Sequence, residues 1–293
     1  MKRIYNIIFI AAGILVLATG CKKSFNEMNL NENKPTSVPA SLLFNGILND
    51  MYDAPYTMYE RWSQYYCCNY DYYGNNRYDF GSGSNYYSTL KNVIKMEEEA
   101  IKGGAAAVNP YAALGKFFRA YFFTKMSMQM GDIPMTEALQ GIQNLTPSYD
   151  PQKKVFQQAF VWLDSANTLL GQLIASNSNT LSGDIYFNND LTKWQKTVNA
   201  FRLRLLIQLS KKDADADLNI KQQFATILAD PNKYPLMTGM SDNLQYAFIN
   251  PTNKYPMSPD NFGFDALRYN TPATYSGLLT QLNDPRVFVT AEP

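Results

Sequence analysis

The sequence PYAALGKFFRAYFFTKMSMQMGDIP, residues 110–134, predicts a long buried helix around which the rest of the chain can be organised. Pro110 suits a first helical turn, where a missing N–H is tolerated, while Gly131 and Pro134 mark the end of the helix. Small side chains alternate along it with large rings at Phe117, Phe118, Tyr121, Phe122 and Phe123. We expect this alternation to let a second helix approach closely while the rings fill the surrounding space.

Helical spacing of apolar residues continues on both sides of this stretch. The expected helices span residues 39–52, 87–101, 151–175, 191–209, 218–229 and 272–282. Asp150 and Asp190 stand where N-caps are expected, whereas residues 71–86 and 231–270 are expected to form long ordered loops with a short strand. The sequence therefore predicts a mostly α fold, in which tetratricopeptide-like helical hairpins support a loop-rich face. No repeat of about 34 residues is clean enough to define the hairpins from sequence alone.

The N-terminus has the pattern of a lipoprotein signal. Lys2 and Arg3 precede an apolar run, residues 7–18, which is too short to span a bilayer and is typical of a secretory signal peptide. Small residues lead from this run into Cys21, so we expect Cys21 to be lipidated; the alternative is a secreted protein in which Cys21 is incidental. The expected division of the chain is a signal peptide, a lipidated flexible tether and a helical domain, at residues 1–20, 21–37 and 38–293.

Charge and composition exclude several classes of function. The net charge is +1, and loss of Lys2 and Arg3 with the signal peptide changes it to −1. A nearly neutral chain gives no electrostatic reason to bind nucleic acid or an anionic lipid surface. The chain contains no histidine, which excludes Ser-His-Asp and Cys-His mechanisms and histidine-bound zinc. We therefore expect no enzyme, no catalytic residue, no cofactor and no metal.

Three weaker patterns have simple interpretations. Adjacent Cys67 and Cys68 are expected to be free thiols, because a vicinal disulfide strains the peptide between them. The run Asp213–Asp217 resembles a calcium loop, but it lacks the glycine at the sixth position and has Phe224 in place of the bidentate glutamate. We expect a solvated turn there. Carboxylates for glycoside hydrolysis are present, but no spacing selects a pair among Asp50, Asp53, Glu60, Asp71 and Asp79.

Three stretches together resemble the SusD/RagB family. Residues 111–123, followed by the turn 130–134, look like the long helix and turn of that family. The sequence DLTKWQKTVNAFRLR, residues 190–204, is similar to its tryptophan-bearing helix, and NDPR, residues 283–286, matches a turn that closes a later helix. With the signal that ends at Cys21, the resemblance covers nearly the whole chain in the right order.

The resemblance implies an outer-membrane, nutrient-binding lipoprotein of Bacteroidota that is lipid-anchored and faces the cell exterior. It implies a partnership with a SusC-like TonB-dependent transporter, on which the protein sits as a lid. Family members run longer than this, with much chain after the turn at residues 283–286, so the resemblance suggests a C-terminal truncation. Lys22 and Lys23 are basic where surface-exported lipoproteins of these bacteria commonly carry acidic residues, so surface exposure rests on the family alone.

The segment RWSQYYCCNYDYYGNNRYDF, residues 61–80, is the predicted ligand site, because aromatic rings alternate in it with amides and charges. Sugars need ring faces for stacking and polar groups for their hydroxyls, and the resemblance implies a glycan site near this loop. Trp62, Tyr65 and Tyr66 have helical spacing and are expected to face the core, as is Trp194 on a later helix. The predicted ligand-binding residues lie beyond them, in the loop: Tyr70, Tyr72, Tyr73, Asn75, Asn76, Arg77, Tyr78 and Asp79.

The sequence therefore indicates a surface lipoprotein that captures oligosaccharides and delivers them to the transporter. Capture of oligopeptides is the alternative within the family, because rings and amides also suit a peptide backbone. Two alternatives from other classes are a polysaccharide-cleaving lipoprotein and a structural surface protein whose tyrosines all lie in the core or in an interface. Release of reducing ends from a glycan would indicate the first, and tyrosine fluorescence unchanged by every candidate ligand would indicate the second.

Overall fold

The computed structural model of the 293-residue chain describes residues 37–55, 57–68, 76, 83–256 and 269–290. The expected signal peptide, Cys21 and nearly all of the expected tether precede these ranges, so those predictions lie outside the described residues.

Helices dominate the described residues, which confirms the predicted mostly α fold. The α-helices are α3 (Ala40–Asp50), α4 (Met58–Trp62), α5 (Tyr87–Lys102), α6 (Pro110–Met130), α7 (Gln152–Ala175), α8 (Leu191–Gln208), α9 (Ile220–Ala229), α11 (Ala273–Gln281) and α12 (Val287–Thr290). Short 3-10 helices lie at Gly141–Gln143, Ser210–Lys212 and Met240–Asp242. Two short strands, β1 (Cys67–Cys68) and β2 (Tyr269–Asn270), pair in antiparallel fashion.

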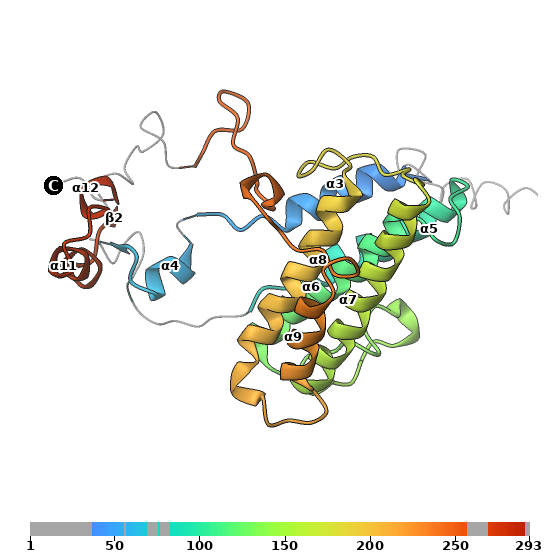
Figure 1. Ribbon diagram of the computed structural model, residues 1–293, viewed down its shortest axis with the longest axis horizontal. Coiled ribbons are helices and arrows are strands. Elements are labelled where there is room, and N and C mark those ends of the chain that lie inside the picture. The colour runs from blue at the N-terminus through green and yellow to red at the C-terminus, as the bar shows by residue number, and fades with distance from the viewer. Residues whose placement is uncertain (1–36, 56, 69–75, 77–82, 257–268, 291–293) are drawn as a thin grey trace, which may run out of the picture. The chain divides into compact units, whose positions relative to one another are not determined.

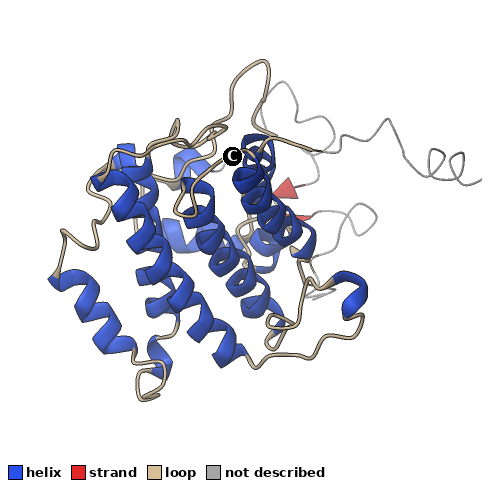
Figure 2. Ribbon diagram, turned by 90° about the vertical axis from the view of Figure 1, so that its right-hand side faces the viewer, coloured by secondary structure: helices blue, strands red, loops and turns tan. Residues whose placement is uncertain are grey.

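Consecutive helices pack side by side as hairpins, in agreement with the predicted tetratricopeptide-like scaffold (Figures 1 and 2). α6 packs against α5 and α7, α7 packs against α8, and α8 packs against α9, while α3 lies against α5. Among the described residues, no helix is both long enough and apolar enough to cross a membrane.

The core of this array is built from aromatic rings. Phe118 on α6 and Trp194 on α8 are fully buried, with ring centroids 6.2 Å apart, and Phe44 of α3 contacts both rings. Burial of each such ring contributes about 1.5–3 kcal/mol. The core positions predicted for Trp194 and for the rings of residues 117–123 are thus confirmed, except that Tyr121 is half-buried and lines a cleft.

Gly115 of α6 shows where the predicted close approach occurs. A Cβ atom at this position would lie 2.1 Å from Oε1 of Glu97 on α5. The space is used by an ion pair, in which Nη1 and Nη2 of Arg119 donate to the two oxygens of Glu97 at 2.7 and 2.5 Å. The small residue therefore admits a charged side chain from the neighbouring helix and allows a bidentate contact.

The prediction that Asp150 caps α7 is wrong. Pro151 is the N-cap and makes no side-chain capping bond, whereas Oδ1 of Asp132 accepts the N–H of Gln152, the first residue of the helix, at 2.8 Å. Asp150 instead accepts hydrogen bonds from the backbone N–H groups of Met135 and Thr136 and from the Thr136 hydroxyl. Burial would raise the pKa of Asp150, but the ammonium of Lys154 and these hydrogen bonds outweigh it and hold the pKa well below its usual range. The carboxylate thus fastens the turn after α6 to the start of α7.

Two predictions for the ends of α8 are confirmed. Asp190 is its N-cap and accepts hydrogen bonds from two backbone N–H groups of the first turn. The run Asp213–Asp217 lies in the connection between α8 and α9. Nζ of Lys153 on α7 lies 2.9 Å from the carboxylate of Asp215 and 2.6 Å from that of Asp217, so these acids pair with a cation of the neighbouring helix.

Candidate functional site

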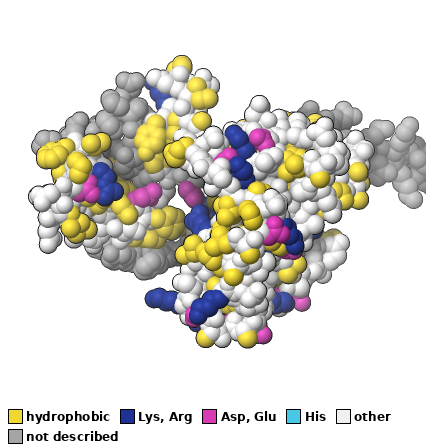
Figure 3. Space-filling view, viewed as in Figure 1, with side chains coloured by type: hydrophobic (Ala, Val, Ile, Leu, Met, Phe, Trp, Pro, Cys, Tyr) yellow, Lys and Arg dark blue, Asp and Glu magenta, His cyan; other side chains and the backbone are white. Residues whose placement is uncertain are grey.

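A cleft of about 620 Å³ opens beside α6 and α8. Its walls come from the end of α3 and the segment after it, from one face each of α6 and α8, from residues 237–255, and from Glu60 of α4. A volume of this size is typical of small-ligand sites in proteins. Figure 3 shows a hollow on one face of the molecule that is bordered by hydrophobic and charged side chains.

Aromatic rings form one wall of the cleft. Tyr52 and Tyr246 are stacked, with centroids 4.4 Å apart and an interplanar angle of 28°. Phe248 lies edge-on to both, at 5.8 and 5.5 Å, and Tyr255 lies edge-on to Phe248 at 4.9 Å. None of these four side chains is fully buried, so the wall offers ring faces to a ligand.

The last turn of α3 holds two of the cleft tyrosines in place. The hydroxyl of Tyr246 donates to Oδ1 of Asn49 at 3.2 Å, and the hydroxyl of Tyr186 donates to the carbonyl oxygen of Leu48 at 3.1 Å. These bonds connect residues 138 and 197 positions apart in the sequence, so they fix the cleft wall to the helical core.

The loop that carries Tyr186 is organised by Asp184. Oδ1 of Asp184 accepts the backbone N–H groups of Tyr186 and Phe187, at 2.9 and 3.2 Å. Oδ2 accepts the indole N–H of Trp194 at 2.8 Å, so a fully buried ring of the core also orients the loop beside the cleft. The indole has a polar edge that must be satisfied when it is buried, and Asp184 satisfies it.

Charged groups at the cleft come from Asp53, Glu60 and Arg204. Oδ1 of Asp53 lies 2.5 Å from Nζ of Lys125, which also lies over the ring of Tyr121 at 5.5 Å from its centroid. Burial would lower the pKa of Lys125, but the hydrogen bond to Asp53 together with the contacts to Tyr121 and Tyr86 outweighs it and raises the pKa above its usual range. Lys125 therefore remains charged and neutralises Asp53.

Two phenol groups of the cleft, those of Tyr52 and Tyr186, stay protonated near neutral pH. Burial, and the neighbouring Tyr246, raise the pKa of Tyr52; burial also raises that of Tyr186. The site can therefore stack a ligand on ring faces and exchange hydrogen bonds with it. Among the residues that the structure describes, no group of three or more Cys, Asp or Glu side chains is placed to hold a metal ion.

The predicted binding loop lies almost wholly outside the described residues, with Asn76 the one member that is described. Its amide oxygen accepts the Cys68 N–H at 2.8 Å, and its amide nitrogen donates to the Cys68 carbonyl at 2.9 Å. Asn76 is thus paired with the backbone of β1. The others stay predictions: Tyr70, Tyr72, Tyr73, Asn75, Arg77, Tyr78 and Asp79.

The expectation that Trp62, Tyr65 and Tyr66 all face the core is only partly right. Tyr66 is buried, and its hydroxyl donates to the carbonyl oxygen of Thr57 at 2.8 Å. Trp62 is half-buried, and Tyr65 is 59% exposed. The reason is that α4 ends at Trp62 and Gln64 adopts a left-handed φ of 59°, so the helical spacing does not continue beyond this point.

Sequence reasoning missed the aromatic wall of the cleft. A signal was present in LQYAFINPTNKYP, residues 244–256, where Tyr246 and Phe248 are two residues apart. In an extended segment this spacing places both rings on one side. Tyr52 gave no such signal, because it follows the last turn of α3 as an isolated ring. Its partner lies nearly two hundred residues away in the sequence.

The helical hairpins carry a cleft with accessible aromatic rings, an arrangement that suits ligand binding. A family model described as "Starch-binding associating with outer membrane" matches residues 32–293, so the chain belongs to the SusD-like family. This confirms the resemblance to SusD/RagB proteins. The family is one of nutrient-binding proteins of the outer membrane.

Solved structures from Bacteroides and Flavobacterium share this fold. A SusD homolog from Bacteroides fragilis NCTC 9343 is 33% identical with a TM-score of 0.72, over 86% of this chain and 52% of the other. An outer membrane protein from Bacteroides vulgatus ATCC 8482 is 30% identical with a TM-score of 0.70, over 86% of this chain and 53% of the other. A SusD homolog from Flavobacterium johnsoniae, 19% identical over 85% and 53%, with a TM-score of 0.58, shares the fold alone.

The chain spans about half the length of these solved relatives. No curated protein matches it.

Proposed function

We propose that this protein is a surface glycan-binding lipoprotein that captures oligosaccharides in the aromatic cleft and delivers them to a SusC-like TonB-dependent transporter. Lipid on Cys21 anchors it to the outer membrane, with the cleft facing the cell exterior. The protein binds its ligand without chemical change. Membership of a family described by starch binding and outer-membrane association supports the coarse part of this proposal.

One observation carries the choice of ligand: the stacked pair of Tyr52 and Tyr246, at 4.4 Å, forms part of an accessible wall in a cleft that also contains hydroxyl groups and a guanidinium. Pyranose rings present patches of C–H bonds that pack on aromatic faces, and their hydroxyls need donors and acceptors at the edge. The cleft supplies both kinds of surface. The homolog from Flavobacterium johnsoniae is described as a chitin-binding protein, which is consistent with a saccharide ligand for this fold.

The loop predicted from sequence supplies a second set of candidate contacts. Tyr72, Tyr73 and Tyr78 would stack on sugar, while Asn75, Arg77 and Asp79 would bond its hydroxyls. We propose that this loop and the cleft both contribute to binding, with the cleft as the principal site because its rings are held by α3.

Retardation in native gels cast with individual polysaccharides, compared with a gel that contains none, tests the proposal. The samples are the full-length chain, the cleft variant Tyr52→Ala/Tyr246→Ala and the loop variant Tyr72→Ala/Tyr73→Ala. Tyr149→Ala, which removes an exposed tyrosine away from both sites, is the matched control. Circular dichroism checks that each variant keeps its helical content.

We expect one class of glycan to retard the wild type and the control. The cleft variant should lose most of this retardation, and the loop variant should lose part of it. Loss of retardation in the loop variant alone would indicate that the ligand binds at residues 70–79 rather than in the cleft. Retardation that both variants retain would place the site elsewhere. A chain that no glycan retards would contradict the proposal and turn the search to oligopeptides, whereas new reducing ends in the gel would indicate an enzyme.

A further inference from the structure

Arg204 is the cation of the cleft that lacks a partner among the described residues. It lies on α8, its side chain is exposed, and it lines the cleft beside Thr197 and Phe201. Within the ranges that the structure describes, it makes no hydrogen bond and no ion pair, and its one recorded interaction is electrostatic, with Tyr121. Its guanidinium carries five N–H donors on an exposed side chain in the cleft wall.

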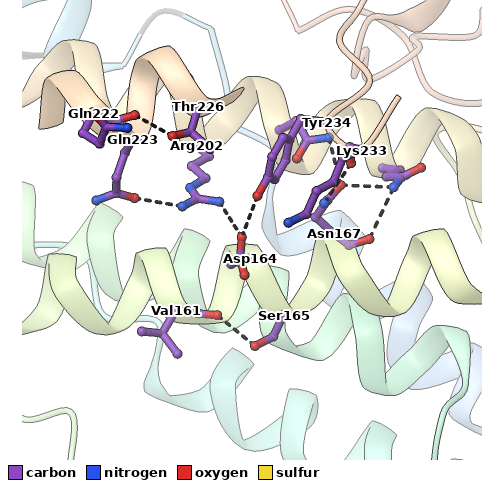
Figure 4. Close-up of polar contacts among 12 residues, drawn as sticks. Val161, Asp164, Ser165, Asn167, Arg202, Gln222, Gln223, Thr226, Lys233 and Tyr234 are labelled. Carbon is purple, nitrogen blue, oxygen red and sulfur yellow. Dashed lines mark hydrogen bonds and ion pairs between the residues drawn. The ribbon is translucent and has the colours of Figure 1, made fainter. Parts of the chain in front are cut away.

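Arg202, two residues before Arg204 on α8, has a structural role, because side chains of neighbouring helices bind its guanidinium (Figure 4). Its Nη1 donates to Oδ1 of Asp164 on α7 at 2.8 Å, and its Nη2 donates to Oε1 of Gln223 on α9 at 2.9 Å. Its guanidinium also lies over the ring of Tyr234, 5.9 Å from the centroid. Residues two apart on a helix point to nearly opposite sides, so α8 uses one arginine to join helices and presents the other to the cleft.

Each carboxylate of the cleft has one oxygen engaged by the protein. Asp53 is paired with Lys125. One oxygen of Glu60 accepts both the backbone N–H and the hydroxyl of Thr57, in a capping box at the start of α4. The hydroxyl of Tyr52, which can donate and accept, also lines the cleft and makes no hydrogen bond to any described residue. The guanidinium of Arg204 adds five donors to this cleft and is the one cation among the described residues of its lining, which suits a ligand with anionic acceptors.

We propose that Arg204 selects ligands that carry an anionic group, namely a carboxylate or a sulfate on a saccharide; this rests on the proposed function of the cleft as the glycan site. A guanidinium donates two parallel N–H bonds to a carboxylate or a sulfate, and such charge-assisted bonds are about twice as strong as those to a neutral hydroxyl. The stacked tyrosines pack against the sugar ring, and Arg204 donates hydrogen bonds to its charged substituent.

The test compares acidic polysaccharides with neutral counterparts by gel retardation of the full-length protein. Polygalacturonate and dextran sulfate present the carboxylate and the sulfate, and galactan and dextran are the neutral arms. Gels contain about 0.15 M salt, so that exposed charges beyond about 8 Å are screened. The variants are Arg204→Gln, Arg204→Lys and Glu60→Gln, with Lys91→Gln as a matched loss of one exposed positive charge on α5.

We expect Arg204→Gln to weaken binding of the acidic glycan about tenfold or more, and Arg204→Lys to weaken it less, because the charge remains but the two-pronged contact is lost. Glu60→Gln should strengthen binding about two- to fivefold, because a like charge is removed while glutamine keeps the capping pattern. Lys91→Gln should change nothing. If Arg204→Gln weakens binding of polygalacturonate, the recognised group is a carboxylate. If it weakens binding of dextran sulfate, the recognised group is a sulfate.

Several results would overturn this inference. The inference fails if Arg204→Gln binds an acidic glycan as strongly as wild type. It also fails if Arg204→Gln and Lys91→Gln weaken binding of that glycan by the same factor. Binding of a neutral glycan alone, abolished in the variant Tyr52→Ala/Tyr246→Ala, would refute the role of Arg204 and leave the proposed function standing. Absence of binding to every glycan would refute both.

Discussion

The aromatic rings of the core and those of the cleft differ in chemistry as well as in burial. In the core, Phe44, Phe118 and Trp194 are fully buried and contact one another across three helices. In the cleft, Tyr52 and Tyr246 stack at 4.4 Å but remain partly accessible. These three core rings are two phenyl groups and an indole whose N–H is satisfied, while the stacked pair of the cleft consists of phenols.

This difference shows why a count of aromatic residues is a poor guide to a binding site. A buried phenol needs a hydrogen-bond partner, so phenyl rings fill a helix interface with less polar cost. A phenol at a cleft offers a face for stacking and keeps its hydroxyl for a ligand or for an anchor such as Asn49. The two regions should therefore respond differently when the same kind of ring is removed.

The largest effect is expected from Phe118→Ala in the core. The ring is fully buried among Phe44, Phe117 and Trp194, so its removal leaves a cavity. The free energy of unfolding should fall by about 3–5 kcal/mol. Chemical denaturation followed by circular dichroism measures this change.

Phe248→Ala is the matched substitution in the cleft. Its ring is half-buried and packs on Tyr246 and Tyr255, so the free energy of unfolding should fall by less than about 1.5 kcal/mol. A loss as large as that of Phe118→Ala would mean that the cleft wall belongs to the core, and the distinction between the two regions would fail.

An intermediate effect is expected from Asp150→Asn, which tests the polar part of the scaffold. The carboxylate binds two backbone N–H groups, a hydroxyl and Lys154, and an amide reproduces only part of this set. The free energy of unfolding at pH 7 should fall by about 1–3 kcal/mol. Thermal unfolding of the variant and the wild type measures the difference.

The same substitution has a defined pH dependence. The pKa of Asp150 is lower in the folded chain than the value of about 3.9 in the unfolded chain. The stabilisation is therefore complete above that unfolded value and is lost as the pH falls through the folded pKa. The stability difference between wild type and Asp150→Asn should be constant from about pH 5 to 7 and should shrink below about pH 4. A difference that stays constant down to about pH 2 would show that the carboxylate charge is not the cause.

Most of the helical scaffold could be predicted from the sequence, because local signals agree there with tertiary packing. Pro110 and Gly131 bound α6 as expected, and the stripe that contains Trp194 is buried as expected. The cap at Asp150 failed because the competing partners, Met135 and Thr136, come from a turn before the helix that local rules do not consider. A strong local pattern was overridden by a contact at longer range.

The cleft could not be predicted in the same way, because it joins segments far apart in the chain. Tyr52 and Tyr246 meet only after α3 and the loop at 237–255 have been placed by the core. The aromatic richness of residues 61–80 was visible in the sequence, whereas a stacked pair across nearly two hundred residues was not. The predicted loop residues remain a hypothesis that the binding variants test.

The smallest effect is expected from Tyr246→Phe, which removes a hydroxyl and keeps the ring. The lost hydrogen bond to Asn49 is exposed, so the free energy of unfolding should fall by only about 0.5–1 kcal/mol. The ring face against Tyr52 is unchanged, so retardation by the glycan should stay within about twofold of wild type, whereas Tyr246→Leu should weaken it about three- to tenfold through loss of stacking. If Tyr246→Phe weakened binding as much as Tyr246→Leu, the hydroxyl would be the group that the ligand contacts. The cleft would then be distinguished from the core by its polar atoms rather than by the exposure of its rings.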